Sequence, residues 1–296
     1  MKGRRLGRGL EEISDVFFSA ESSKTVTDIP LDRSVPEFDA KRQAMPEIQT
    51  IGITGGPMDT MGIFAICNIS IELARQGYRV LVVDDDPGNL NVTRLMGLMD
   101  IENAAEPILI HAPMGVRTTY RTPFLSHLLS YRDIHQNGNR YPWPEEYQKF
   151  DFIIFHIPYN RLEELGAMLR QISLFMVIAP TDRTGMLESY SVIKALHQKA
   201  RQIQIGLIVL SEKGEQDASD AFSRMAGNTK RFLQKDLLSY AFIQKCEEIG
   251  KSMAEGVPLV LKWSTSEMRR HIYNISRLII DDHDQRLRSI EKAHVL

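Results

Sequence analysis

The 296-residue chain contains only two cysteines, Cys67 and Cys246, and their spacing matches no metal-binding pattern. This scarcity excludes a disulfide-stabilised scaffold and a cysteine-rich zinc site, and we expect both side chains to be buried thiols in a reducing cytosol. No apolar run approaches the ~20 residues that span a bilayer, and the basic N-terminus lacks the apolar segment of a signal peptide. The sequence therefore predicts a cytoplasmic protein, with any recruitment to a cell pole or membrane depending on a partner.

A strong charge of either sign is also missing. The formal net charge is −2 and the isoelectric point is about 6.5, so no global field attracts nucleic acid, and we expect no direct nucleic-acid partner. The length allows one large α/β domain or two small ones, with ample core.

The stretch from residue 51 to residue 98 carries the clearest pattern. An apolar run ends in Gly55-Gly56, a helical segment follows from about Ile63 to Arg75, and Gly77 precedes a second strand at 79–83 that leads into three aspartates. This is one βαβ unit, whose crossover should be right-handed. In such units the first turn and the start of the helix point backbone N–H groups at a bound anion.

The rest of the chain continues the alternation of strands and helices. Strands are predicted at 150–155, 174–179, 205–210 and 237–242, and helices at 162–170, 222–233, 247–255 and 266–280. The strands are continuous apolar runs, which is typical of a parallel sheet covered on both faces. We therefore predict a doubly wound, mostly parallel α/β fold over residues 47–281, with a C-terminal tail at 282–296.

This order of motifs resembles the MinD/ParA-type P-loop ATPases of the SIMIBI class, and most of all the flagellar-number FlhG/FleN branch. The resemblance covers about residues 48–280 and is carried by Ile53-Thr54-Gly55-Gly56, Asn68-Ile69, Gly77, the strand 80–84, and Asp86, Gly88, Asn91-Val92 and 95–98. It implies a MinD-like domain with a nucleotide at the glycine turn.

The phosphate loop itself departs from the family pattern. The two family lysines fall on Pro57 and Gly62, the intervening glycines on Met58, Asp59 and Met61, and the magnesium-binding hydroxyl on Ile63. Pro57 has no N–H to offer a phosphate, and a carboxylate at Asp59 would repel a phosphate by about 4 kcal/mol per charge pair at ~4 Å and an effective dielectric of ~20. No lysine lies between residues 51 and 75. We predict that the phosphate site is lost.

A second catalytic position has also changed. The aspartate that holds the magnesium-bound water in the family falls on His156, and imidazole is a poor ligand for Mg²⁺. Asp84 and Asp86 match the family's acidic positions, but they need another partner, such as backbone N–H groups, Thr60 or water. We therefore predict no catalytic residues, no cofactor and no resident metal, and a vestigial nucleotide site made of Gly55, Gly56, Pro57, Asp59, Thr60, Gly62, Ile63, Asp84, Asp86 and His156.

Residues 1–46 form a separate region with a flexible composition. Its beginning predicts a short basic amphipathic helix at about 5–18. The run RRLGRGL resembles the N-terminal tail of ParB-type proteins, which docks on ParA-type ATPases and supplies an activating arginine. The residues predicted to bind a partner are Arg4, Arg5, Leu6, Arg8, Leu10, Ile13 and Phe17. The alternatives are a helix that folds back on its own domain and a membrane-surface helix.

Three functions remain open from the sequence. The favoured one is a non-catalytic regulator or scaffold in the spatial organisation of the cell, which engages a MinD/ParA-type ATPase through residues 1–20 and pairs as a homodimer or heterodimer. The second is a divergent ATPase that binds ATP and Mg²⁺ weakly. The third reuses the pocket around Asp84, Asp86 and His156 for another small ligand or a metal.

Overall fold

The computed structural model describes residues 48–56, 59–84, 92–97, 108–111, 116–120, 147–162, 169, 171–263 and 266–294. A sheet forms the centre of this part of the chain. Within these ranges the sheet has eight strands in the order β3-β4-β2-β5-β1-β6-β7-β8. Only β3 runs antiparallel to its neighbour β4. The strands are β1 (Gln49–Thr54), β2 (Val80–Val83), β3 (Ile108–His111), β4 (Arg117–Tyr120), β5 (Phe152–His156), β6 (Leu174–Pro180), β7 (Gln204–Ser211) and β8 (Leu238–Gln244).

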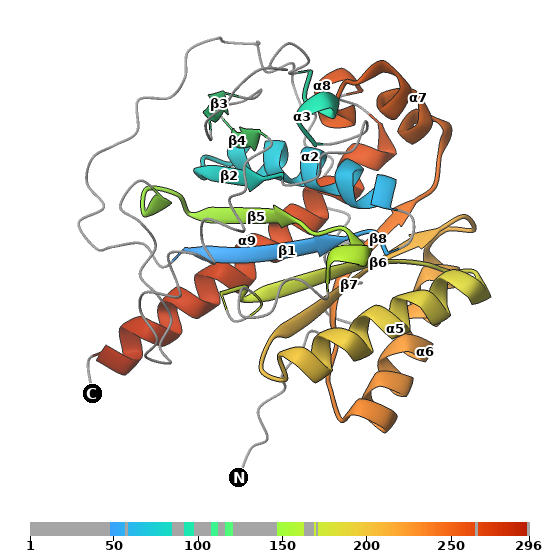
Figure 1. Ribbon diagram of the computed structural model, residues 1–296. Coiled ribbons are helices and arrows are strands. Elements are labelled where there is room, and N and C mark those ends of the chain that lie inside the picture. Colours follow the sequence, from blue (N-terminus) through green and yellow to red (C-terminus); the bar gives the residue numbers. More distant parts are fainter. Residues whose placement is uncertain are drawn as a thin grey trace, which may run out of the picture.

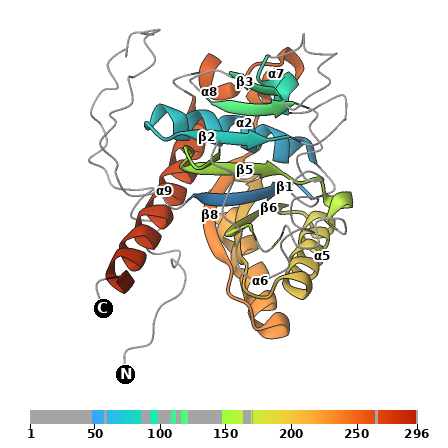
Figure 2. The ribbon, with the colours of Figure 1, turned by 60° about the vertical axis from the view of Figure 1, so that its left-hand side comes forward.

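Helices cover both faces of this sheet (Figure 1). The helices are α2 (Asp59–Arg75), α3 (Val92–Leu95), α5 (Arg183–Lys199), α6 (Glu215–Leu233), α7 (Glu247–Glu255), α8 (Leu259–Lys262) and α9 (Glu267–His294), with a 3₁₀ turn η4 (Tyr159–Arg161). α2 and α9 pack on one face, and α5 and α6 on the other, as the turned view in Figure 2 also shows. The predicted doubly wound, mostly parallel α/β fold is confirmed.

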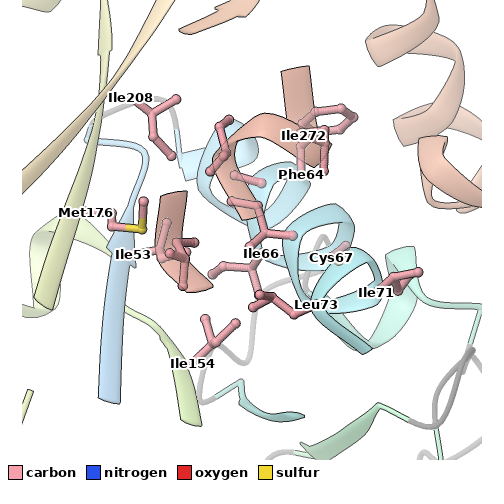
Figure 3. Close-up of a cluster of buried hydrophobic side chains, with 14 of the residues drawn as sticks. Ile53, Phe64, Ile66, Cys67, Ile71, Leu73, Ile154, Met176, Ile208 and Ile272 are labelled. Carbon is pink, nitrogen blue, oxygen red and sulfur yellow. The ribbon is translucent and has the colours of Figure 1, made fainter. Parts of the chain in front are cut away.

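The core between the sheet, α2 and α9 explains why the strands are apolar throughout. Side chains of Ile53, Ile154 and Met176 from three neighbouring strands gather with Ile66 and Leu73 of α2 (Figure 3), and all are fully buried. Each side chain of this size contributes roughly 1.5–3 kcal/mol when it leaves water. Alternate residues of the same strands face α5 and α6 in a second core. Burial on both faces is what a continuous apolar strand requires.

Three helix boundaries differ from the sequence prediction. α6 begins at Glu215 rather than near Phe222. α2 begins at Asp59 rather than near Ile63, because an acidic residue in the first turn complements the helix dipole and the following Met61 is buried. α9 continues to His294 through the segment predicted as a tail, so the expected end near Ile280 is wrong.

Tertiary contacts hold the distal half of α9. The His283 ring packs against the rings of Phe152 and Tyr78, with centroid separations of 4.9 and 6.4 Å. One turn later, Arg286 donates to the backbone carbonyl of Ser173 over 3.2 Å. The helix therefore crosses the amino ends of the central strands as part of the domain.

The cysteine prediction holds for one residue only. Cys67 is buried in α2, whereas Cys246 is partly exposed at the start of α7. Both are free thiols. Within the described ranges, no helix combines the length and apolar character needed to cross a membrane.

Candidate functional site

The carboxyl ends of the parallel strands meet at one edge of the sheet, which we call the carboxyl edge. β1 ends there at Thr54 and is followed by Gly55 and Gly56. Gly56 has a φ of 63°, a left-handed conformation that glycine adopts without strain. α2 then starts directly against this turn: a Cβ on Gly62 would lie 2.9 Å from the backbone nitrogen of Gly55. The close approach leaves no room for a side chain at position 62.

His156, Asp59 and Asp84 lie together at this edge, and we call them the Asp59–His156–Asp84 bridge. His156 is the last residue of β5 and Asp84 directly follows β2, and these two strands are hydrogen-bonded neighbours. The His156 Nδ1 lies 3.3 Å from an Asp84 oxygen, and its Nε2 lies 3.1 Å from an Asp59 oxygen. The imidazole is therefore held between two carboxylates.

The two arms of this bridge differ in geometry and exposure. The Asp84 contact is a buried hydrogen bond. The Asp59 contact has ion-pair distance, but the ring N–H is not aligned for a hydrogen bond, and the Asp59 side chain is 26% exposed. The Asp59 arm is therefore the more accessible half of the bridge.

The His156 imidazole is protonated at neutral pH. Burial of the side chain opposes its charge and lowers the pKa, but the contacts to Asp59 and Asp84 outweigh burial and raise the pKa to about 9. A buried cation between two carboxylates is compensated on both sides. Because both ring nitrogens face carboxylates, the ring offers no lone pair to a metal.

Two other predicted site residues, Thr60 and Ile63, do not join this cluster. Thr60 is exposed to solvent, and Ile63 is buried in the core between α2 and the sheet. The position expected to supply a magnesium-binding hydroxyl therefore serves packing. Pro57 and Asp86 lie outside the described residues, as do all the predicted partner-binding residues between 4 and 17.

The pairing of Asp59 with His156 was not anticipated from the sequence. From the sequence alone, Asp59 is a residue that repels phosphate and His156 is a replaced magnesium ligand, with no indication that the two are in contact. The sequence does contain one indication of this pairing: Asp59 and His156 both stand at positions of the family's nucleotide site, and their side chains can carry opposite charges. Among the described residues, no group of three or more histidine, cysteine, aspartate or glutamate side chains has an arrangement that could hold a metal ion.

Polar side chains at the ends of β6 and β7 are also engaged internally. The buried Ser211 hydroxyl contacts the Gly214 carbonyl at 2.8 Å and an Asp217 carboxylate oxygen at 2.9 Å. Hydrogen bonds from Thr181 and Ser211 lower the pKa of Asp217. Ser211 at the end of β7 is thus part of an internal polar cluster.

Comparison with known proteins supports the family resemblance. No family model matches the chain. The antiactivator FleN of Pseudomonas aeruginosa is 20% identical over 219 residues, which cover 71% of this chain and 78% of FleN.

Two solved structures share the fold. The MinC:MinD cell division protein complex of Aquifex aeolicus superposes with a TM-score of 0.57 at 14% identity, and covers 79% of this chain and 96% of that chain. A ParA family ATPase from Chlorobium tepidum has a TM-score of 0.57 at 12% identity, and covers 77% of this chain and 97% of that chain. The chain thus shares the fold of the MinD/ParA-type P-loop ATPases, and its sequence is similar to that of FleN over 71% of its length.

Proposed function

We propose that this protein is a non-catalytic MinD/ParA-type regulator, a pseudo-ATPase that acts by contacting other proteins rather than by turning over ATP. One observation carries the proposal: the Asp59 carboxylate sits at the start of α2, paired with His156. In a P-loop protein this place receives a phosphate, because the helix start and its N–H groups attract an anion. Here the chain supplies its own anion at that place.

The residues around Asp59 also support the proposal that nucleotide does not bind. A triphosphate entering the site would meet Asp59 at close range without a lysine to neutralise it, since the described part of the glycine turn and α2 contains none. Magnesium would have to displace a protonated His156 from Asp84. Each change weakens nucleotide binding by a separate mechanism, so restoring one residue leaves the others in place.

The partner is proposed from the relatives and the N-terminal motif. FleN is named an antiactivator, and the similar MinD structure is of a complex with MinC. By analogy, this chain regulates a partner in the positioning of the flagellum, the chromosome or the cell pole, with residues 1–20 engaging a MinD/ParA-type ATPase. The arginines Arg4, Arg5 and Arg8 supply the charge for that contact.

Isothermal titration calorimetry of the full chain with MgATP tests the absence of nucleotide binding. We expect no saturable heat and no increase in melting temperature up to millimolar ATP. A MinD/ParA-type ATPase with an intact lysine-containing loop, titrated in the same buffer, serves as the positive control. Saturable binding at micromolar concentration would instead establish a divergent ATPase.

A further inference from the structure

Three segments that start or end at the carboxyl edge are tied together by the side chain of His156. The imidazole is fixed to the end of β5, one nitrogen contacts Asp84 at the end of β2, and the other contacts Asp59 at the start of α2. The His156 side chain has no exposed surface. The bridge therefore links elements that are distant in the sequence through a buried, charged contact.

The order of charges along the bridge is anion, cation, anion. A magnesium ion held by a protein carboxylate and coordinated by a phosphate has the same order. Asp59 takes the place of the phosphate at the helix start, and the imidazolium takes the place of the metal beside Asp84. This comparison rests on the proposed loss of nucleotide binding, because a bound phosphate would need the position of Asp59.

We propose that the Asp59–His156–Asp84 bridge is a permanent internal substitute for Mg²⁺-phosphate, and that it fixes the start of α2 against the ends of β2 and β5 in one arrangement whether or not nucleotide is present. Partners then meet the same surface at all times. Regulation by this protein depends on its amount and on the partner's state, not on a nucleotide cycle of its own.

The contact between Asp59 and His156 is the part of the bridge that fixes the start of α2 against the strands. The Asp84 arm joins two strands that already share backbone hydrogen bonds, since Val83 is in register with Phe155. The first turn of α2 has no such ladder, because the first N–H groups of a helix lack partners within the helix. Loss of the bridge should therefore loosen the first turn of α2 before it loosens the sheet.

Hydrogen–deuterium exchange of the full chain tests this proposal at amides 63–66, because their hydrogen-bond acceptors are the carbonyls of the first turn of α2. The variants are Asp59→Asn, Asp84→Asn and His156→Gln, with Asp236→Asn as the control because it breaks the exposed 2.7 Å pair with Lys230 far from this edge. We expect exchange about tenfold faster in the first turn of α2 in all three bridge variants, unchanged exchange in the control, and no further increase in the Asp59→Asn/His156→Gln double variant.

Asp84→Asn separates the bridge from a simple helix-dipole effect, because Asp84 lies outside α2 and is not a helix-terminal charge. If the two core variants do not fold, Asp59→Asn at its partly exposed position still decides. The bridge predicts faster exchange at the start of α2 and unchanged exchange at the Ile157 amide, whose 3.0 Å hydrogen bond to the Ile53 carbonyl belongs to the sheet. Unchanged exchange at the start of α2 in Asp59→Asn, or in folded Asp84→Asn and His156→Gln, overturns the proposal.

A calorimetric titration of the same samples with MgATP tests the proposed function independently of the exchange experiment. Micromolar ATP binding by the wild type contradicts the non-catalytic function whatever the exchange data show. Wild-type exchange that slows on addition of MgATP contradicts the permanent bridge. Unchanged exchange with ATP, together with loosened α2 in the variants, supports both.

Discussion

His156 and Asp59 face each other across the start of α2, with 3.1 Å between a ring nitrogen and a carboxylate oxygen. The two side chains replace a family magnesium ligand and a family glycine, and each alone would be unfavourable at a nucleotide site. Together they neutralise one another, and Asp84 completes the compensation on the other side of the ring. The proposed loss of nucleotide binding and the observed internal contact thus rest on the same two residues.

The bridge predicts a pH dependence of stability. The pKa of His156 is raised from 6.5 to about 9 in the folded protein, so its stabilising contribution is fully present below pH 6.5 and is lost as the pH rises through 9. Urea denaturation should show the free energy of unfolding falling by roughly 3 kcal/mol at most across this window. The same series with His156→Gln is the control, and an equal decline in that variant would exclude His156 as the source.

Gly62 is required by the close approach of α2 to the glycine turn. A Cβ at this position would lie 2.9 Å from the Gly55 nitrogen, so Gly62→Ala should destabilise the protein by about 1–3 kcal/mol in chemical denaturation. Gly227→Ala in α6 is the matched control, because nothing lies within 4 Å of its added Cβ. That change should stabilise by about 0.5–1 kcal/mol. Equal effects of the two substitutions would contradict the packing argument.

His283 anchors the distal half of α9. Its ring packs on Phe152 and Tyr78, and it is 3% exposed. His283→Ala should therefore lower the free energy of unfolding by about 1–3 kcal/mol, while Lys292→Ala on the exposed end of the same helix should change it by less than about 0.5 kcal/mol. Thermal and urea denaturation measure both. A neutral His283→Ala would mean that the distal turns are held by other contacts.

Asn68 links α2 to the short helix α8. Its side-chain nitrogen donates to the Phe64 carbonyl at 2.8 Å, and its oxygen accepts from the Val260 N–H at 3.0 Å. Asn68→Leu leaves that buried N–H without its partner, which should cost about 1–3 kcal/mol. Ser191→Ala, which removes an exposed hydrogen bond to the Leu187 carbonyl, is the control and should be nearly neutral.

The N-terminal motif predicts a function in trans. A peptide of residues 1–20 should bind a cognate MinD/ParA-type ATPase and change its rate of ATP hydrolysis, and replacement of Arg4, Arg5 and Arg8 by alanine should abolish the effect. Steady-state hydrolysis assays measure this directly. A peptide with the acidic residues Glu11 and Glu12 replaced by glutamine controls for net charge. An undiminished effect of the triple-alanine peptide would rule out the arginine mechanism.

The sequence by itself determined the order of strands and helices and the loss of the lysine loop. Apolar runs and the glycine turn at Gly55-Gly56 are local patterns, because strand burial and turn conformation depend on residues close in the chain. The missing lysine is likewise read directly from the residues. These features predicted the α/β fold and the absence of a triphosphate site without any knowledge of contacts.

Only the tertiary structure decided which side chains lie together where the family resemblance places the phosphate site. Asp59 and His156 are far apart in the sequence, and their pairing depends on β5 lying between β1 and β2, so that its end points at the start of α2. The end of α9 was not predictable from the sequence for the same reason: its distal turns are held by contacts with Phe152 and Ser173, which are distant in the sequence. The hydrophobic periodicity of a segment predicts its own secondary structure. The partner of a buried charge depends instead on which distant strands the fold places side by side.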